Sequence, residues 1–411
     1  MQLSAPSAVH ASWPARIVAW TAALAAALPA VAAAQLQTSL GASAFREAGG
    51  PLSMTVLMPE VSADAQLSSG FAVNAAWTAD VVSGASVAVV DAPADDVDAI
   101  SSATVSDVRH VLGGGVRVGD HQSTWSAGYR YGFENDYRSH AFDIGARTEL
   151  YDRNTALEIN YARSFDSVCD GLDASEAVLK PRLTSSDDCF ADGDDVRERD
   201  LSLQTFQAAW SQHWTGIFAT QLTATAQILE GFQANPYRAV RIGRASAQEH
   251  HPDERARYAI GAGARVWIEP LAGALQPQLR AYRDTWDIRS FSAELGYEQT
   301  IGAGLRVRGR GRYYLQGGAA FYSDDYVLAP RGQYFTGDRE LSPMRSVLLG
   351  AQLSWALPSD EQGRVLGVLG GLELVLKGDL LKSWFDEFHY DRVEVPNDTA
   401  LLGSFALVAG F

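Results

Sequence analysis

Four arginines at alternate positions are the residues of this sequence best suited to chemistry. They are Arg306, Arg308, Arg310 and Arg312. Successive side chains of a β-strand point to opposite faces, so a strand here places four guanidinium groups on one face. A guanidinium group is always charged and pairs with carboxylates or phosphates through two parallel hydrogen bonds. The row predicts either recognition of anions or pairing with carboxylates on adjacent strands.

Acidic residues with the same spacing precede this row. Glu294 and Glu298 lie on the polar face of segment 290–301, and a tight turn at 301–303 predicts Glu298 opposite Arg306 and Glu294 opposite Arg310. Neighbouring segments add further charges, namely Arg257, Arg265, Glu269, Arg280, Asp284, Glu373, Lys377 and Asp379. Two interpretations stay open: a charged constriction that selects solutes such as anions, and a wall of mutually neutralising pairs that braces a narrow lumen.

Long alternating segments must position these charges. Apolar or aromatic residues alternate with small or polar ones in segments 71–81, 125–133, 218–228 and 347–355. Segments of this length suit a tilted membrane-spanning strand of ~9–11 residues better than an ordinary strand of ~5–6. Arginine facing lipid near the midplane costs ~2–4 kcal/mol. We therefore expect a transmembrane antiparallel barrel with a charged lumen, rather than a soluble sandwich.

The alternation predicts an all-β, up-and-down barrel of about 16 strands, or 14 if the weakest segment, 36–46, and one other are lost. The expected strands are 36–46, 52–63, 70–83, 107–119, 122–134, 137–150, 155–165, 199–212, 216–230, 256–269, 273–286, 290–301, 304–316, 345–357, 364–379 and 399–411. Short and long links alternate for most of the chain. This asymmetry is typical of barrels with short periplasmic turns and long extracellular loops.

Composition restricts the class of protein. The 411 residues are 47% hydrophobic and 20% charged, and the mean hydropathy is -0.09. These values exclude a polytopic helical membrane protein and a disordered chain. A net charge of -16 makes nucleic acid an unexpected partner. Residues 1–34 have the pattern of a signal peptide, with Arg16, an apolar run and small residues before Gln35. Residues 35–411 then form one exported barrel.

The last segment indicates the destination of the chain. Leu401, Phe405, Leu407 and Phe411 share one face, and the sequence stops on an aromatic residue. This ending resembles the terminal strand of bacterial outer-membrane proteins, which the barrel-insertion machinery recognises. We expect the outer membrane of a Gram-negative bacterium, with lipid and that machinery as partners. The aromatic girdles would include outward-facing Trp77, Trp125, Tyr129, Tyr131, Phe133 and Trp355.

Cys169 and Cys189 are the two cysteines of the sequence. An exported protein allows them to form a disulfide. The closed loop of about 20 residues would contribute roughly 3 kcal/mol in the chain-entropy model. The pair matches neither a C-x-x-C redox motif nor a haem attachment motif.

The remaining clusters of polar residues are interpreted as ordinary surface loops. Segment 166–198 is strongly acidic, and Asp192–Asp195 could hold calcium but does not match the EF-hand spacing. Segment 91–98 is similar in its acidity, and His250-His251 with Asp253 could ligate a transition metal only if adjacent side chains converged. No G-x-S-x-G motif is present. We expect no metal, no cofactor and no enzymatic activity.

Two stretches carry a family resemblance. The first holds Asp80, Ser83, Gly84 and Ser86, followed by Asp98, Ser101 and Ser102. The second holds Glu134, Asn135, Asp136 and Tyr137. Together they resemble a bacterial family called domain-of-unknown-function family 3570, and the resemblance covers nearly all of residues 35–411. It implies an exported barrel and no established activity.

These observations predict passage of small solutes or ions through a charged lumen, as in a porin-like channel or a barrel that assists transport. The alternative is a closed structural barrel that binds an extracellular or an electron-transfer partner. The sequence leaves the choice between the two open.

Overall fold

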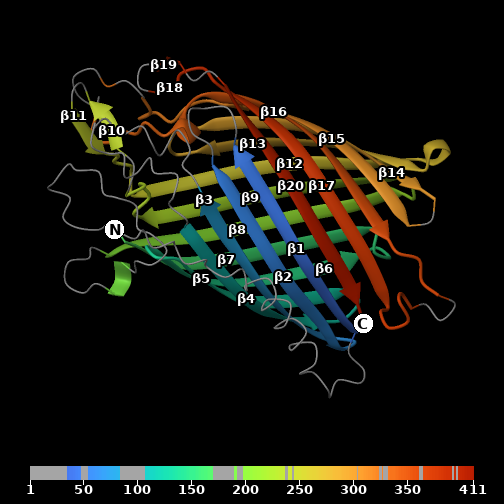
Figure 1. Ribbon diagram of the computed structural model, residues 1–411. Coiled ribbons are helices and arrows are strands. Elements are labelled where there is room, and N and C mark those ends of the chain that lie inside the picture. Colours follow the sequence, from blue (N-terminus) through green and yellow to red (C-terminus); the bar gives the residue numbers. More distant parts are fainter. Residues whose placement is uncertain are drawn as a thin grey trace, which may run out of the picture.

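Sixteen antiparallel strands form one closed barrel in the computed structural model (Figure 1). Each strand pairs with the next along the chain, and β20 closes the barrel by pairing with β1. The structure describes residues 35–47, 54–83, 107–169, 189–191, 198–236, 239–242, 245–302, 304–323, 326, 332–360, 364–390, 393–394 and 397–411. The expected signal peptide lies outside them.

The barrel strands are β1 (Gln35–Glu47), β2 (Thr55–Ser68), β3 (Phe71–Ser83), β4 (Asp107–Gly119), β5 (Ser123–Phe133), β6 (Tyr137–Leu150), β7 (Thr155–Cys169), β8 (Glu198–Thr215), β9 (Phe218–Gly231), β12 (Glu254–Ile268), β13 (Gly273–Asp284), β14 (Arg289–Ile301), β15 (Leu305–Gln316), β16 (Met344–Ala356), β17 (Gly371–Phe385) and β20 (Asn397–Gly410). Short elements outside the barrel are β10 (Ala239–Ile242), β11 (Ala245–Gln248), β18 (His389–Tyr390), β19 (Val393–Glu394) and the 3-10 helices η1 (Cys189–Ala191), η3 (Glu269–Leu271) and η4 (Arg339–Leu341).

The expected number of sixteen strands is confirmed. The weakest predicted strand is present as β1, which hydrogen-bonds to β2 on one side and β20 on the other. The boundaries of β2 differ from the prediction of 52–63, because the strand continues to Ser68 before a tight turn. The pairs β10–β11 and β18–β19 lie in segments expected to be loops.

The two faces of the barrel differ as the alternation predicts. Leu279, Leu349 and Phe405 point outward and are exposed. Their strand neighbours toward the interior include charged or small residues such as Arg280, Gly350 and Ser404. An apolar belt exposed on every side of the barrel is unfavourable in water. It is favourable in contact with the hydrocarbon of a bilayer. Trp125 and Trp355 lie on the same outer face, toward the end with the short turns. The structure therefore has the surface of a transmembrane barrel.

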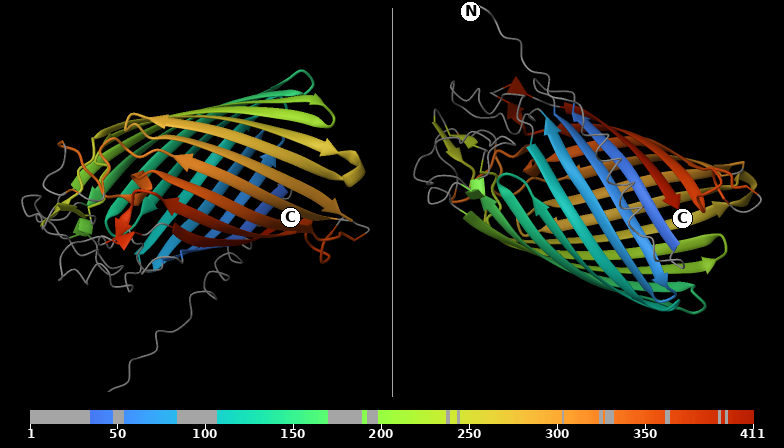
Figure 2. Two further views of the ribbon diagram at one scale, coloured as in Figure 1. Left: turned by 90° about the horizontal axis from the view of Figure 1, so that it is seen from above. Right: turned by 60° about the horizontal axis from the view of Figure 1, so that its bottom comes forward.

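The two ends of the barrel are unlike. One end carries short turns, such as residues 120–122, where Asp120 accepts hydrogen bonds from the backbone N–H groups of Gln122 and Ser123. These bonds lower the pKa of the Asp120 carboxyl. The other end carries the strand pairs β10–β11 and β18–β19, as the two views in Figure 2 show. Loops at this end can pack on one another across the mouth.

Within the described part of the chain, no helix is long and apolar enough to cross a membrane. The described residues also include no group of three or more His, Cys, Asp or Glu side chains that could hold a metal ion.

The outer face gives a direct test of lipid contact. Leu279→Arg places a cation on the outward face near the middle of β13, and we expect it to lower the free energy of unfolding by about 2–4 kcal/mol. Its neighbour Gln278 is exposed toward the interior, so Gln278→Arg should have a much smaller effect. Denaturant unfolding of both variants in lipid vesicles provides the measurement. Equal destabilisation by the two variants would contradict the assignment of the faces.

Candidate functional site

The four arginines of β15 all face the interior. Their register partners on β16 are Ser354, Gln352, Gly350 and Leu348. The outward positions between them are Val307, Gly309 and Gly311. The residues predicted from alternation to share one face therefore do so.

The predicted cross-strand pairing with β14 is wrong by two residues. Glu298 lies opposite Arg308 rather than Arg306, and Glu294 lies opposite Arg312 rather than Arg310. β14 ends at Ile301 and β15 begins at Leu305, so the connection is one residue longer than expected. Gly302 and Gly304 have positive φ angles of 60° and 84°, a conformation that glycine adopts without strain.

The arginines of this wall form a network of ion pairs with carboxylates of two strands, β14 and β17. Arg308 and Arg310 both approach the Glu294 carboxylate, at 3.8 and 4.0 Å. Arg306 donates a hydrogen bond of 2.6 Å to Glu373 of β17. Arg265 of β12 pairs with Glu298 at 3.1 Å. The charges are therefore joined diagonally and across intervening strands.

The best-formed pair joins Arg310 and Asp379. Arg310 Nε and Nη2 each donate a hydrogen bond of 2.9 Å to the two carboxylate oxygens, and Lys377 Nζ lies 3.3 Å from the same group. The Asp379 side chain is only 3% exposed. The pair passes over Gly350 of β16, where a Cβ would collide with the Asp379 carboxylate and crowd Arg310 Nε. The glycine provides the room that the pair occupies.

The remaining predicted charges on this wall differ in their surroundings. Asp284 is buried and accepts hydrogen bonds from Arg255 and from the Tyr282 hydroxyl. Arg257 donates to Gln227 at 3.1 Å. Arg280 faces the interior on β13, opposite Gly261 and Ser292, and is exposed. The structure thus places the predicted charges on one interior wall, formed by β12–β17, except Glu269, which lies in η3 of the β12–β13 turn.

The opposite interior wall, formed by β2–β8, carries an excess of the opposite charge. Among the described residues, cations outnumber acids on β12–β17, where the cations are Arg255, Arg257, Arg265, Arg280, Arg306, Arg308, Arg310, Arg312 and Lys377 and the acids are Asp284, Glu294, Glu298, Glu373 and Asp379. Acids outnumber cations on β2–β8, where the acids are Glu60, Asp64, Asp80, Asp143, Glu149, Glu158 and Asp166 and the cations are Arg109, Arg117, Arg130, Arg147 and Arg199. The interior is therefore polarised from wall to wall.

Interior charges in the barrel remain accessible to solvent. The exposed fractions of the side chains are 48% for Arg306, 56% for Arg265, 54% for Arg130 and 47% for Arg147. Side chains filling a dry barrel would be buried, as in a packed protein interior. The interior is therefore a hollow large enough for water around these groups.

Several residues of the family signatures meet at the loop end of the interior. Asp80 of β3 lies opposite Arg109 of β4. The Arg109 guanidinium stacks 4.8 Å from the Tyr137 ring, and the Tyr137 hydroxyl donates to Asp166 at 2.5 Å. The backbone of Ser83 belongs to β3, while Gly84, Ser86, Asp98, Ser101 and Ser102 lie outside the described residues. Sequence spacing alone did not link Asp80 to Tyr137.

The second signature supports the loop that carries the cysteines. The turn Glu134–Asp136 joins β5 to β6, and its Asn135 and Asp136 carbonyls accept hydrogen bonds from the backbone N–H groups of Cys189 and Cys169. Cys169 and Cys189 form a disulfide, with their Cα atoms 6.4 Å apart. The signature turn and the disulfide thus hold η1 against the rim of the barrel.

A loop crosses the rim at the mouth of the barrel. Arg339 of η4, in the connection between β15 and β16, reaches past β17 to pair with Glu47 of β1 and Asp398 of β20. All three side chains are buried. Thr336 of the same loop donates to the Glu249 carboxylate of the β9–β12 connection at 2.9 Å. We call the described residues of this connection, 317–323, 326 and 332–343, the strap. Alternation does not predict it, because its partners lie far apart along the chain.

His250 and His251, the pair considered above as metal ligands, contact residues of other connections. His250 Nδ1 lies 2.6 Å from the Gln333 carbonyl of the strap. His251 packs edge-to-face against Trp286 and lies 3.4 Å from the Glu249 carboxylate. Trp286 packs with Ile288, Ala319 and Leu341 in a small apolar cluster. These contacts join three connections at the mouth.

Residues 7–366 match the family described as "Protein of unknown function (DUF3570)". The chain belongs to the DUF3570 family. No curated protein is similar to this DUF3570 member in sequence. Its signature residues Asp80 and Tyr137 occupy the interior of the barrel near the mouth, as described above.

Solved structures of outer-membrane barrels have a similar shape. A bacterial polysaccharide outer membrane secretin has a TM-score of 0.48 at 10% identity, with 92% of this chain and 98% of that chain covered. OccD3 (OpdP) of Pseudomonas aeruginosa has a TM-score of 0.44 at 9% identity, with 93% and 92% covered. The siderophore receptor PirA of Acinetobacter baumannii has a TM-score of 0.43 at 11% identity, with 85% and 53% covered. The fold assignment rests on the strand pairing of this chain.

The pair between Arg310 and Asp379 can be tested by comparing two arginines of one strand. Arg310→Gln leaves a buried carboxylate with only Lys377 nearby, and we expect the free energy of unfolding to fall by about 1–3 kcal/mol. Arg312 makes no ion pair within the described residues, so Arg312→Gln should change it by less than about 0.5 kcal/mol. Denaturant unfolding in vesicles measures both. If Arg312→Gln lowered the free energy of unfolding more than Arg310→Gln, the pairing of Arg310 with Asp379 would be refuted.

Proposed function

We propose that this protein is a porin-like channel of the Gram-negative outer membrane, through which small solutes or ions cross within the charged lumen. The proposal includes export by the signal peptide at residues 1–34. It follows from a barrel whose apolar face is outside and whose charged face is inside, the arrangement of outer-membrane barrels.

The exposure of the interior charges carries this proposal. Arg265, Arg306, Arg130 and Arg147 lie on both interior walls and stay about half exposed. A charged group within the span of a membrane is stable only beside partners or water. The interior thus offers a polar path for solutes that the lipid excludes.

The polarity of the two walls suggests how solutes are sorted. Anions are attracted to the wall of β12–β17, and cations to the wall of β2–β8. Arg310 and Arg306 are largely neutralised by Asp379 and Glu373, whereas Arg280 and Arg312 have no ion-pair partner within the described residues. The excess positive charge of the first wall favours small anions over cations of the same size.

A closed structural barrel is the second candidate, and the strap is the observation that favours it. Arg339 is held between Glu47 and Asp398, and Thr336 joins the strap to the β9–β12 connection. Loops tied in this way narrow the mouth. Such a barrel would serve to bind an extracellular or an electron-transfer partner rather than to pass solutes.

Single-channel recording in planar lipid bilayers separates the two candidates. We expect steady unitary currents from the purified protein. In a salt gradient, Arg308→Glu should move the reversal potential toward cation selectivity, because it exchanges a positive for a negative charge on the anion-attracting wall. The variant Arg283→Gln, whose side chain lies on the outward face of β13, should leave the selectivity unchanged.

Two results would overturn the channel. Protein that inserts and gives no current would favour the closed barrel. If Arg308→Glu and wild type had the same ion selectivity, the ions would not move along the wall of β12–β17.

A further inference from the structure

Two arginines face each other on the outer surface of the barrel. Arg283 of β13 is the direct register partner of Arg289 of β14, and both side chains are exposed. Their alternation with Asp284 and Ser290 places them on the lipid-facing side. Like charges directly opposite each other destabilise a sheet. The pair therefore needs compensating negative charge.

The chain itself supplies little of that charge. Arg289 lies 3.8 Å from the Asp287 carboxylate, and both side chains are about 70% exposed, so solvent screens this contact. Arg283 has no ion-pair partner among the described residues, and its neighbour on β12 is Tyr258. The compensating charge would have to come from outside the protein.

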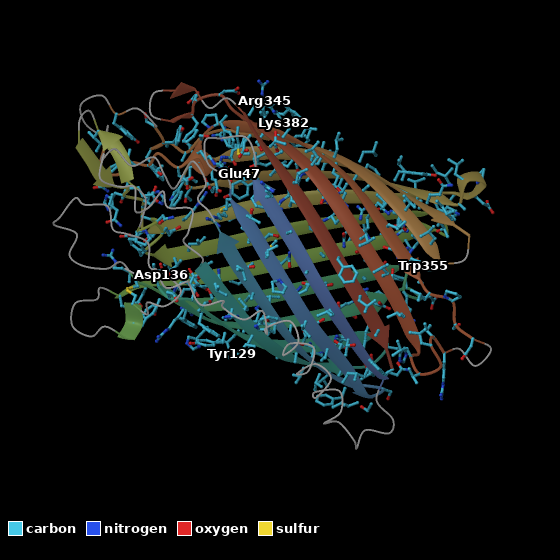
Figure 3. All side chains as sticks on the ribbon, in the orientation of Figure 1. Glu47, Tyr129, Asp136, Arg345, Trp355 and Lys382 are labelled. Atoms are coloured by element: carbon cyan, nitrogen blue, oxygen red, sulfur yellow. A yellow bond between two sulfur atoms is a disulfide. The ribbon has the colours of Figure 1, made fainter. Side chains whose placement is uncertain are left out.

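Further outward-facing cations lie on the strands between this arginine pair and β1, where the barrel closes. Arg345 of β16 faces outward beside Trp384 of β17, with the guanidinium 5.9 Å from the indole ring. Lys382, two residues before Trp384 in β17, also faces outward. Figure 3 shows Arg345 and Lys382 near each other at the loop end of the barrel. We call the outward cations of β13–β17 and β1 the cationic belt. Its members are Arg46, Arg283, Arg289, Arg345 and Lys382.

The belt lies at the border between the apolar face and the loops. Phe291 and Tyr313 are exposed on the same face, two positions closer to the middle of the barrel than Arg289 and Arg345, and Leu315 is exposed directly opposite Arg345. Aromatic residues above an apolar band mark the level of lipid headgroups. Long cationic side chains at this level reach the headgroups while their stems cover apolar surface.

The rest of the rim has no such excess of cations. On β6–β12, the outward cations Arg138 and Arg163 are accompanied by Asp200, Glu230 and Glu254, and the last two are direct register partners. Along the belt, Arg289 pairs with Asp287 and Arg345 pairs with Asp386, and Lys382 donates a hydrogen bond to Thr399. Among the described residues of these strands, the outward excess of positive charge on this chain of net charge -16 thus lies on β13–β17 and β1.

We propose that the cationic belt binds the phosphate groups of lipid A, the anionic glycolipid anchor of the outer leaflet of Gram-negative outer membranes. Guanidinium groups match phosphate oxygens through paired hydrogen bonds. The facing guanidinium groups of Arg283 and Arg289 hold one phosphate between them, and Arg345 with Lys382 takes another. The acyl chains lie along the apolar face below. The site rests on the membrane location proposed above, and it is independent of solute passage.

Native mass spectrometry of the delipidated, detergent-solubilised protein tests this site. We expect bisphosphorylated lipid A to bind well above dephosphorylated lipid A and phosphatidylglycerol. Arg283→Gln/Arg289→Gln should weaken binding by about fivefold for each cation removed. Arg345→Gln/Lys382→Gln should act in the same direction, so that the conclusion does not depend on one double variant.

Arg153→Gln, in an exposed turn at the opposite end of the barrel, is the matched control and should bind like wild type. The proposal is overturned if both double variants, shown to be folded by their heat-modifiable migration on gels, retain wild-type binding. It is also overturned if phosphatidylglycerol binds as tightly as lipid A. Single-channel currents of the same variants should stay as in wild type, which separates failure of this site from failure of the channel.

Discussion

The cost of placing charge in lipid is the constraint on which this structure depends. A strand with arginine at four alternate positions can cross a membrane only if that face is kept away from hydrocarbon. Closing sixteen strands on themselves satisfies this requirement and leaves no unpaired strand edge. The same closure brings the polar faces of all strands into one enclosed space. The charged lumen follows from the fold and the alternation together.

Within that space, the ion pairs and the hollow serve different purposes. Arg310 and Asp379 are neutralised by each other over Gly350 and brace the wall. Arg265 and Arg306 keep half their surface in contact with the lumen although each has a partner. The two readings of the arginine row, a bracing network and a charged passage, therefore describe different members of one wall.

The sequence predicted the strands and their faces, because alternation is a local property that each segment shows by itself. It did not predict which charges pair. The register between β14 and β15 depended on one additional turn residue, and the partner of Arg310 lies two strands away on β17. The position of Arg339 between Glu47 and Asp398 depends on how a long loop folds over the rim. Such contacts are set by the closed topology, which no single segment encodes.

Labelling at two adjacent positions tests most directly whether the charged face lines a wet interior. The account predicts that, in lipid vesicles, a membrane-impermeant charged thiol reagent modifies Arg308→Cys. It also predicts that Gly309→Cys, whose added side chain meets no neighbour and points to lipid, stays unmodified. Modification of Gly309→Cys with protection of Arg308→Cys would contradict the account.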